Sequence, residues 1–400
     1  MQHHLKVSAV FPDDHRRALL VGRVWIEGAG AVLVLVRDNA IYDLSGIAAT
    51  CSDLLQLPDP ASAVRRHATS LKPLAVTTDV LANSAHDARD LTSPWFLAPC
   101  DLQAIKAAGV TFVSSMLERV IEEQARGDAG KADALRHDIV ALMGEDLKSV
   151  VPGSPTATQL KQALMAGGAW SQYLEVGIGP DAEIFTKAQP MSAVGLGAEV
   201  GIHPRSVWNN PEPEVVLAVN SHGQIMGATL GNDVNLRDFE GRSALLLGKA
   251  KDNNASCAIG PFLRLFDDDF GLADVRKVSL AMKVSGTGTQ GSDEAPFEME
   301  GSSSMSLISR DPVDLVRQTI GDNHQYPDGF MLFLGTMFAP TVDRFADGQG
   351  FTHRIGDLVR ISNSQLGGLV NQVNRSDLIA PWSYGLRALM RDLARRGALA

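Results

Sequence analysis

The sequence predicts an α+β protein with a strand-rich second part. Before about residue 169, much of the chain has apolar residues at helical spacing, with one stretch typical of a hairpin. After that point, short apolar or alternating runs are separated by Gly, Pro, Asn and Asp, which is typical of strands and turns. A chain of 400 residues with 45% hydrophobic and 20% charged residues can bury a sizeable core and form two domains.

The first part predicts one hairpin and three helices. Over 31–44, an apolar run, a turn-prone Asp38-Asn39 pair and an alternating run follow one another, as in a hairpin. A short helix is expected over 61–69, because Pro-Asp-Pro precedes it. Helical spacing predicts two longer helices, from 102 to about 126 and from 131 to about 147.

The sequence after about residue 169 predicts a series of strands followed by one helix. The strands are expected over 214–220, 224–230, 278–284, 330–334 and 358–362, and the helix over 382–396. Three units follow from this division: an N-terminal mixed domain (1–105), a helical connecting segment (106–168) and a strand-rich domain (169–400).

Charge and cysteine content exclude several classes of function. With 36 Lys and Arg against 46 Asp and Glu, the formal net charge is −10, which argues against a nucleic-acid or anionic-membrane partner. No apolar run approaches the ~20 residues of a membrane span. Cys51, Cys100 and Cys257 form no paired motif, and MQHHLKVSAV is not a secretion signal, so a cytoplasmic protein is expected.

Three carboxylates around a predicted hairpin form the first candidate site. Glu212 and Glu214 lie two residues apart, so their side chains would point to the same face of a strand. If the chain turns tightly at His222-Gly223, Asp233 lies opposite Glu212, with Cβ atoms ~5 Å apart. Such like charges need protons or a cation, and oxygen ligands select a hard ion such as Mg²⁺, Mn²⁺ or Ca²⁺.

Two explanations of these carboxylates stay open. Pro211 and Pro213 lack N–H donors, which predicts a sheet edge where a metal ion could reach the carboxylates. The alternative is a solvated, charged edge strand that discourages aggregation. Spacing alone favours the solvated edge, because E-x-E is common on exposed strands. The motifs elsewhere in the chain favour the metal site.

Those motifs stand in a definite order. They are Phe185-Thr186-Lys187, Glu212-Pro213-Glu214, Asn232-Asp233 with Arg237-Asp238, Lys251 nine residues before Gly260-Pro261, and Leu334-Gly335-Thr336. Over roughly residues 175–370, this order resembles the fumarylacetoacetate hydrolase superfamily. The resemblance implies a mixed β-roll catalytic domain with a smaller N-terminal α/β domain. It also implies a homodimer or homotetramer and a Mg²⁺ ion, with Mn²⁺ or Ca²⁺ as substitutes, held by Glu212, Glu214 and Asp233.

Further features are similar to the 2-keto-3-deoxy-pentonate dehydratase branch of that superfamily. They are PEPE, SCAIGP, GSSSMSLISRDP and the position of Glu183 four residues before Lys187. The resemblance implies a small-molecule substrate, a 2-keto-3-deoxy sugar acid, that loses water to give 2,5-dioxopentanoate. Lys251 is then expected to take the C3 proton if the metal ion and nearby cations lower its pKa, and Glu183 to act at the departing C4 hydroxyl.

The expected substrate-binding residues are Lys187, Arg237, Ser304 and Thr336. Each has a structural alternative. Lys187 and Lys249 would be surface cations, and Arg237 and Asp238 a structural pair. Ser304 would lie in a solvated loop, and the Thr336 hydroxyl would stabilise a turn.

Two other functions remain possible on the sequence. A metal-dependent C–C hydrolase of an acylpyruvate or diketo sugar acid would use a histidine–glutamate pair to activate water. The nearest histidines, His137 and His203, stand in no such arrangement. A catalytically idle relative would bind a sugar acid without turnover.

Overall fold

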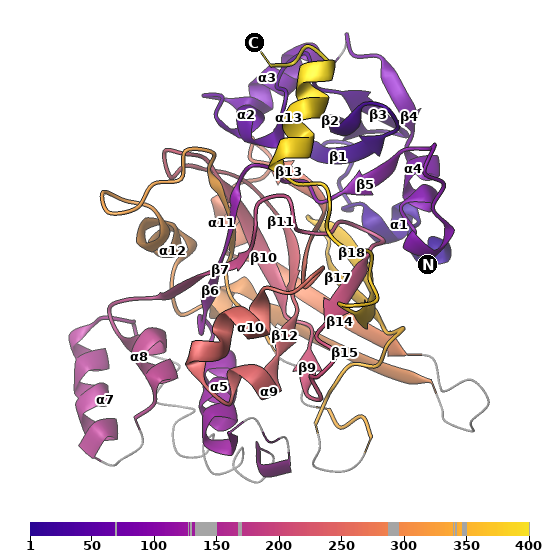
Figure 1. Ribbon diagram of the computed structural model, residues 1–400. Coiled ribbons are helices and arrows are strands. Elements are labelled where there is room, and N and C mark those ends of the chain that lie inside the picture. Colours follow the sequence, from indigo (N-terminus) through magenta and orange to yellow (C-terminus); the bar gives the residue numbers. More distant parts are fainter. Residues whose placement is uncertain are drawn as a thin grey trace.

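The computed structural model describes most of the chain. The described residues are 1–68, 70–126, 128, 130–132, 150–166, 170–286, 296–338, 340, 342–345 and 350–399. The helix expected over 131–147, and His137 with it, therefore lies almost wholly outside the described residues. Figure 1 shows the N-terminal elements at one end of the molecule and the helices α5, α7 and α8 at the other.

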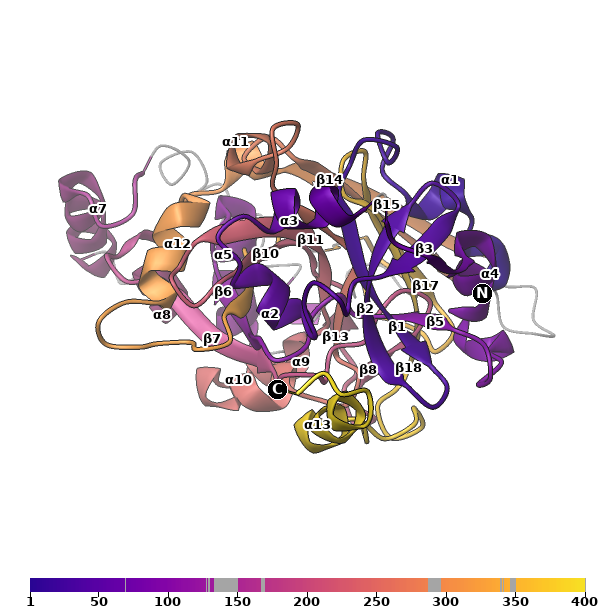
Figure 2. The same ribbon diagram turned by 90° about the horizontal axis from the view of Figure 1, so that it is seen from above.

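One large mixed sheet spans the molecule and carries the candidate site. Within the described residues it has eleven strands, in the order β4-β3-β2-β1-β13-β11-β10-β16-β6-β7, with β5 paired to β1. Only the β16–β6 pairing among these is parallel. Figure 2 shows β1, β2 and β3 side by side at the N-terminal end. The strands are β1 (Leu20–Ile26), β2 (Gly30–Arg37), β3 (Ala40–Asp43), β4 (Pro73–Val76), β5 (Trp95–Leu97), β6 (Ala104–Gly109), β7 (Glu183–Ala188), β10 (Pro213–Val219), β11 (Ile225–Asp233), β13 (Cys257–Leu265) and β16 (Phe330–Phe333).

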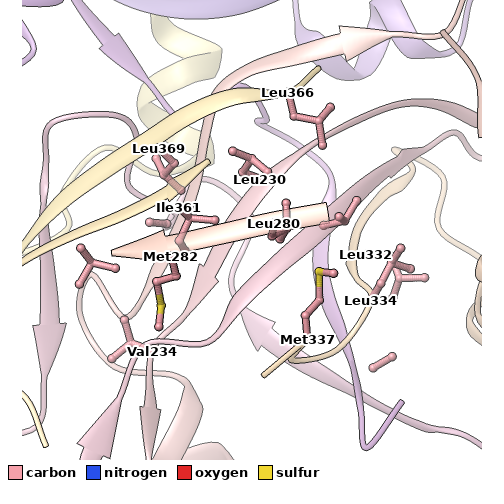
Figure 3. Close-up of a cluster of buried hydrophobic side chains, with 14 of the residues drawn as sticks. Leu230, Val234, Leu280, Met282, Leu332, Leu334, Met337, Ile361, Leu366 and Leu369 are labelled. Atoms are coloured by element: carbon pink, nitrogen blue, oxygen red, sulfur yellow. The ribbon is translucent and has the colours of Figure 1, made fainter. Parts of the chain in front are cut away.

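A second sheet packs against the first through the main hydrophobic core. Leu230 and Leu332 of the large sheet meet Leu280, Met282 and Ile361 of the second sheet in one buried cluster, part of which is drawn in Figure 3. Burial of these side chains stabilises the pair of sheets by removing apolar surface from water. The second sheet has the order β15 (Phe297–Ser304), β14 (Ser279–Gly286), β17 (Leu358–Asn363), β18 (Gly367–Arg375) and β8 (Glu199–Ile202), and β9 (Asn209–Asn210) pairs with β12 (Asn235–Leu236).

The helices are mostly short and lie around the sheets. α5 packs against α8 through a separate apolar cluster that includes Val120, Ile121 and Leu174. No helix in the described part of the chain is both long and apolar enough to cross a membrane. The helices are α1 (Val7–Val10), α2 (Cys51–Leu55), α3 (Pro60–His67), α4 (Thr77–Asn83), α5 (Val113–Ala125), α7 (Pro155–Ala166), α8 (Gln172–Ile178), α9 (Arg237–Glu240), α10 (Leu247–Lys251), α11 (Leu272–Val275), α12 (Pro312–Thr319) and α13 (Leu386–Arg395).

The α+β class and the expected strands are confirmed, and so is the hairpin over 31–44. The helix expected over 102–126 is wrong in its first part, because residues 104–109 form strand β6. This short segment pairs on one side with β16 and on the other with β7, so pairing within the sheet overrides the helical spacing. The strands of residues 1–105 are hydrogen-bonded into the same sheet as β10 and β11. The three-unit division remains a prediction.

Candidate metal centre and active site

The β10–β11 hairpin aligns the three carboxylates as the sequence predicts. Glu214 pairs with Gly231, and Pro213 with Asn232, which is the expected register. The amide of Asp233 donates a hydrogen bond to the carbonyl of Glu212 at 3.1 Å. The turn contains Gly223 at φ +75°, a conformation that glycine adopts without strain.

The predicted sheet edge is wrong, and so is the solvated-edge alternative. β10 lies between β11 and β16, and Glu212, Glu214 and Asp233 are only 1–2% exposed. Pro213 is the first residue of its strand, a position where a missing N–H is tolerated. The pairing with β16 begins only at Val216, so the carboxylates lie at the end of a central strand.

The three carboxylates form a compact, buried group of oxygen ligands. Their ligand atoms lie within 4.8 Å of one another. Glu214 accepts hydrogen bonds from the Gly335 amide at 2.6 Å and the Thr336 hydroxyl at 3.3 Å, but no cation of the described residues pairs with it. Burial, followed by the charges of Asp233 and Glu212, raises the pKa of Glu214 well above its usual range. Glu214 is therefore protonated unless a cation binds beside it.

Two buried lysines form ion pairs with the other two carboxylates of the triad, Glu212 and Asp233. Lys251 Nζ lies 2.5 Å from Glu212 Oε2 and 3.1 Å from Asp233 Oδ2. Lys187 Nζ lies 2.8 Å from Asp233 Oδ1. Lys187 is fully buried, so the surface-cation alternative is wrong for it, whereas it is confirmed for the exposed Lys249.

The carboxylates around Lys251 raise its pKa. Burial acts to lower this pKa, but the charges of Asp233 and Glu212 outweigh it and raise the pKa above its usual value. Lys251 is therefore an ammonium group as long as no other cation shares these carboxylates. The expected lowering of its pKa depends on a bound metal ion and stays a prediction.

Strand β7 supplies a further acidic group. Glu183, Phe185 and Lys187 alternate along β7 and so share one face. The Phe185 ring centre lies 5.8 Å from Lys251 Nζ. Burial raises the pKa of Glu183 to about 7, and the charge of Glu240 adds to this effect, while Arg119 and Lys251 oppose it. A carboxyl group with this pKa can hold or release a proton near neutral pH.

Sequence reasoning missed a cluster of charges behind the triad. Arg119 of α5 lies 2.6 Å from Glu212 Oε1, 2.8 Å from Glu122 Oε2 and 2.6 Å from Glu240 Oε2. Arg237 joins the cluster at 3.2 Å from Glu122 Oε1. The only sequence signal is that Arg119 and Glu122 are three residues apart on a helix, where side chains can pair. Nothing in the sequence connects them to Glu212, 93 residues away from Arg119.

We expect Arg119→Gln to destabilise the protein strongly, because Glu122, Glu212 and Glu240 would lose a shared buried cation. Breaking a buried ion pair costs about 3–5 kcal/mol. Arg119→Lys keeps the charge but not the planar guanidinium group. Its loss of stability should therefore lie between those of wild type and Arg119→Gln. Thermal unfolding measures both variants, with Arg66→Gln as the exposed-arginine control. An Arg119→Gln midpoint equal to that of the control would contradict the role of this cluster.

The charges of the whole cluster match one divalent ion. Four cations face six carboxylates, so two negative charges remain when all are ionised. Together with an all-oxygen triad, this balance fits a hard dication such as Mg²⁺. The carboxylates are Glu122, Glu183, Glu212, Glu214, Asp233 and Glu240, and the cations are Arg119, Lys187, Arg237 and Lys251.

The expected substrate-binding residues divide into two groups. Lys187 and Thr336 contact the triad directly. Arg237 is buried against Glu122 and Asn210, the latter at 2.9 Å. The Ser304 hydroxyl accepts a hydrogen bond from the Ser306 amide at the end of β15, and Ser304 makes no hydrogen bond to the triad within the described part of the chain.

The suggested Arg237–Asp238 pair is wrong. The Asp238 carboxylate instead accepts hydrogen bonds from the Ser206 hydroxyl at 2.8 Å and the Val207 amide at 3.0 Å. Arg237 therefore serves the cluster around Glu122, and Asp238 fixes the loop before β9.

Sequence comparison finds homologues among sugar-acid dehydratases. No family model matches the chain. A 2-dehydro-3-deoxy-D-arabinonate dehydratase of Saccharolobus solfataricus is 30% identical over 193 residues, which cover 48% of this chain and 59% of that protein. A probable 2-keto-3-deoxyxylonate dehydratase of Haloferax volcanii is 27% identical over 341 residues, covering 85% of this chain and 94% of that protein.

Solved structures show the same fold. A 2-keto-3-deoxy-D-arabinonate dehydratase complexed with magnesium and 2,5-dioxopentanoate has a TM-score of 0.57 at 20% identity, covering 89% of this chain and 99% of that one. A fumarylacetoacetate hydrolase of Exiguobacterium antarcticum has a TM-score of 0.52 at 16% identity, covering 90% and 100%.

Fold and site together define an α+β protein of the β-roll class with a buried acidic site that can hold a divalent ion. The chain's homologues include 2-keto-3-deoxy sugar-acid dehydratases, and its fold is that of a solved dehydratase of this kind and of a fumarylacetoacetate hydrolase.

Proposed function

We propose that the protein is a Mg²⁺-dependent dehydratase that converts a 2-keto-3-deoxy-pentonate to 2,5-dioxopentanoate and water. The observation that carries the proposal is the buried triad of Glu212, Glu214 and Asp233 with Lys251 beside it. The homologous dehydratases support the substrate class, since they act on 2-keto-3-deoxy sugar acids by name.

The reaction requires several proton movements. A C3 proton leaves, the C4–O bond breaks, and the departing hydroxyl takes a proton to become water. The resulting C3–C4 double bond then moves to C4–C5 as a C5 proton is removed and C3 is reprotonated. The C5 enol formed in this way loses its hydroxyl proton and gains a proton at C4, which gives the C5 aldehyde. When bound, the divalent ion would supply Lewis acidity toward the carboxylate and keto oxygens and so acidify the C3–H bond.

Lys251 and Glu183 are the proton-transfer groups of the proposal. Glu183, with its pKa near neutrality, can deliver a proton to the departing hydroxyl. Lys251 can accept a proton only after losing its own. Neutralisation of Glu212 and Asp233 would remove the two charges that raise the Lys251 pKa and leave burial, which lowers it.

Lys187, Arg237, Ser304 and Thr336 remain the proposed substrate-binding residues. Thr336 is supported most directly, because its hydroxyl contacts Glu214. For Arg237, burial against Glu122 supports a role in holding the site as well. The proposal further includes Mn²⁺ or Ca²⁺ as substitutes, a homodimer or homotetramer, and a cytoplasmic location without nucleic-acid or membrane partners.

Product analysis tests the proposed function. The protein is incubated with Mg²⁺ and a panel of 2-keto-3-deoxy-pentonates that differ at C4, and the products are followed by proton NMR. Dehydration gives one dioxo acid with an aldehyde signal. A C–C hydrolase would leave these substrates unchanged and would instead cleave an acylpyruvate, added in a parallel assay, to pyruvate and a second acid. Substrate-induced thermal stabilisation without turnover would support the idle relative.

The raised pKa of Glu183 predicts a pH-dependent difference in stability. Between about 4.5 and 7 the unfolded carboxyl is ionised while the folded one keeps its proton, so stability decreases as pH rises through this window. Glu183→Gln removes this loss and should gain up to about 3 kcal/mol over wild type by pH 7. Thermal midpoints of both metal-free proteins from pH 4.5 to 8 measure the gain. A difference independent of pH would contradict the raised pKa.

A further inference from the structure

A second cavity lies apart from the carboxylate triad. Its volume is about 520 Å³, within the range of roughly 300–1,000 Å³ that small-molecule sites occupy. None of the triad residues lines it. Its walls come from β1, the segment around β5, the loop after β7, the loop after α10, and residues 379–384 before α13.

Aromatic side chains form much of this cavity. Trp25 and Trp95 are stacked, with ring centres 5.7 Å apart and planes 25° apart. Tyr384 meets Trp25 edge-on at 4.9 Å. Trp382 is 46% exposed and completes the wall. Such an arrangement offers flat apolar surfaces to a planar group.

Arg89 gives the cavity a positive charge without a counter-ion. Its guanidinium lies 5.0 Å from the Trp95 ring centre, and its Nη2 donates to the Ser84 carbonyl at 2.8 Å. Its Nε is buried and has no hydrogen-bond partner among the described residues. Burial lowers the pKa of Arg89, and no charged neighbour opposes this among the described residues. A guanidinium in this situation gains from a ligand carboxylate, which can accept two hydrogen bonds from it.

The second arginine of the cavity, Arg23, already has a carboxylate partner within the protein. Arg23 lies 3.5 Å from Asp101 and donates to the carbonyls of Ala98 and Cys100. Its charge and its donors are therefore already used within the protein, and Arg89 is left as the group that an anion would meet.

We propose that this cavity is a binding site for a small, flat aromatic carboxylate. The ring packs against the indoles of Trp25, Trp95 and Trp382, and the carboxylate pairs with Arg89. The aromatic ring distinguishes this ligand from the sugar acid of the proposed function.

The cavity shares a wall with the segment that carries Lys251. Asn254 and Ala255 line it, three and four residues after Lys251, and Met191 lines it four residues after Lys187. The Val194 amide donates to the Cys257 carbonyl, and Cys257 pairs with Asp233 across the sheet. Hydrogen-bonded backbone thus connects the cavity wall to a residue of the triad.

Calorimetric titration of the full chain tests the proposal with phenylacetate and its neutral isostere, phenylacetamide. We expect one phenylacetate per chain with a Kd on the order of 1 mM or tighter, and at least about tenfold weaker binding of phenylacetamide. Arg89→Gln should remove the preference for the carboxylate, and Arg66→Gln, an exposed arginine, should keep it. If Arg89→Gln does not fold, Trp382→Leu takes its place and should weaken both probes.

Three results would overturn the proposal. The first is equal binding of the two probes, or no saturation. The second is displacement of phenylacetate by a 2-keto-3-deoxy-pentonate, which would place the probe in the catalytic site. The third is dissociation of an oligomer by Trp382→Leu in light scattering, which would make the cavity a contact between copies of the chain. Only the second result depends on the proposed function, because it uses the proposed substrate; the first and the third do not.

Discussion

Glu214→Gln is expected to abolish Mg²⁺ binding and turnover while leaving the metal-free protein at least as stable as wild type. Glu214 is buried between Asp233 and Glu212, has no cation partner among the described residues, and has a raised pKa. The raised pKa keeps Glu214 protonated in the metal-free protein, so a neutral Gln of the same shape costs that protein little. A lost Lewis acid costs several kcal/mol, which corresponds to roughly 10³-fold in rate.

The measurement is a thermal midpoint with and without Mg²⁺, together with the rate of aldehyde formation. Wild type should be stabilised by Mg²⁺ and Glu214→Gln should not. Glu27→Gln, an exposed glutamate, is the control and should behave as wild type. A Glu214→Gln protein that is markedly less stable without metal would indicate a structural role for this carboxylate instead.

Lys251→Met is expected to abolish turnover as well, but with the opposite effect on stability. Lys251 pairs with Glu212 and Asp233, so its removal leaves two buried carboxylates without this cation. Loss of one partner of a buried pair costs about 3–5 kcal/mol. Mg²⁺ should restore much of this loss, because the dication would neutralise the same carboxylates.

Lys249→Met is the matched control for this variant. Lys249 lies two residues earlier in α10 and is exposed, so its substitution should change neither stability nor rate. Thermal midpoints with increasing Mg²⁺ and single-turnover rates measure both variants. If Lys251→Met turns over at a near-normal rate, Lys251 takes no part in proton transfer.

Local rules were enough to predict the triad. Alternation along a strand placed Glu212 and Glu214 on one face, and the turn at Gly223 set the register that brings Asp233 to Glu212. Each of these steps depends on residues close together in the sequence. The order of motifs then connected Lys251, Lys187 and Thr336 to the same site, and their contacts with the triad agree with it.

Residues brought in by distant packing could not be predicted in this way. Arg119 reaches Glu212 because α5 packs beside the end of β10, and no local pattern encodes that arrangement. Dependence on distant residues also explains why the prediction of a sheet edge at Glu212 and Glu214 was wrong. Pro213 excludes a ladder bond at one residue, but whether β16 pairs further along β10 depends on residues more than a hundred positions away. The raised pKa of Lys251 likewise follows from carboxylates that only the fold brings near it.

Calorimetric titration of Mg²⁺ into the metal-free wild-type and Glu214→Gln proteins tests the central claim most directly. The claim is that Glu212, Glu214 and Asp233 are the ligands of a single catalytic divalent ion. We expect one ion per chain for wild type and no saturable binding for Glu214→Gln. Equal binding to both proteins, or none to wild type, would contradict the metal site and the dehydratase mechanism built on it.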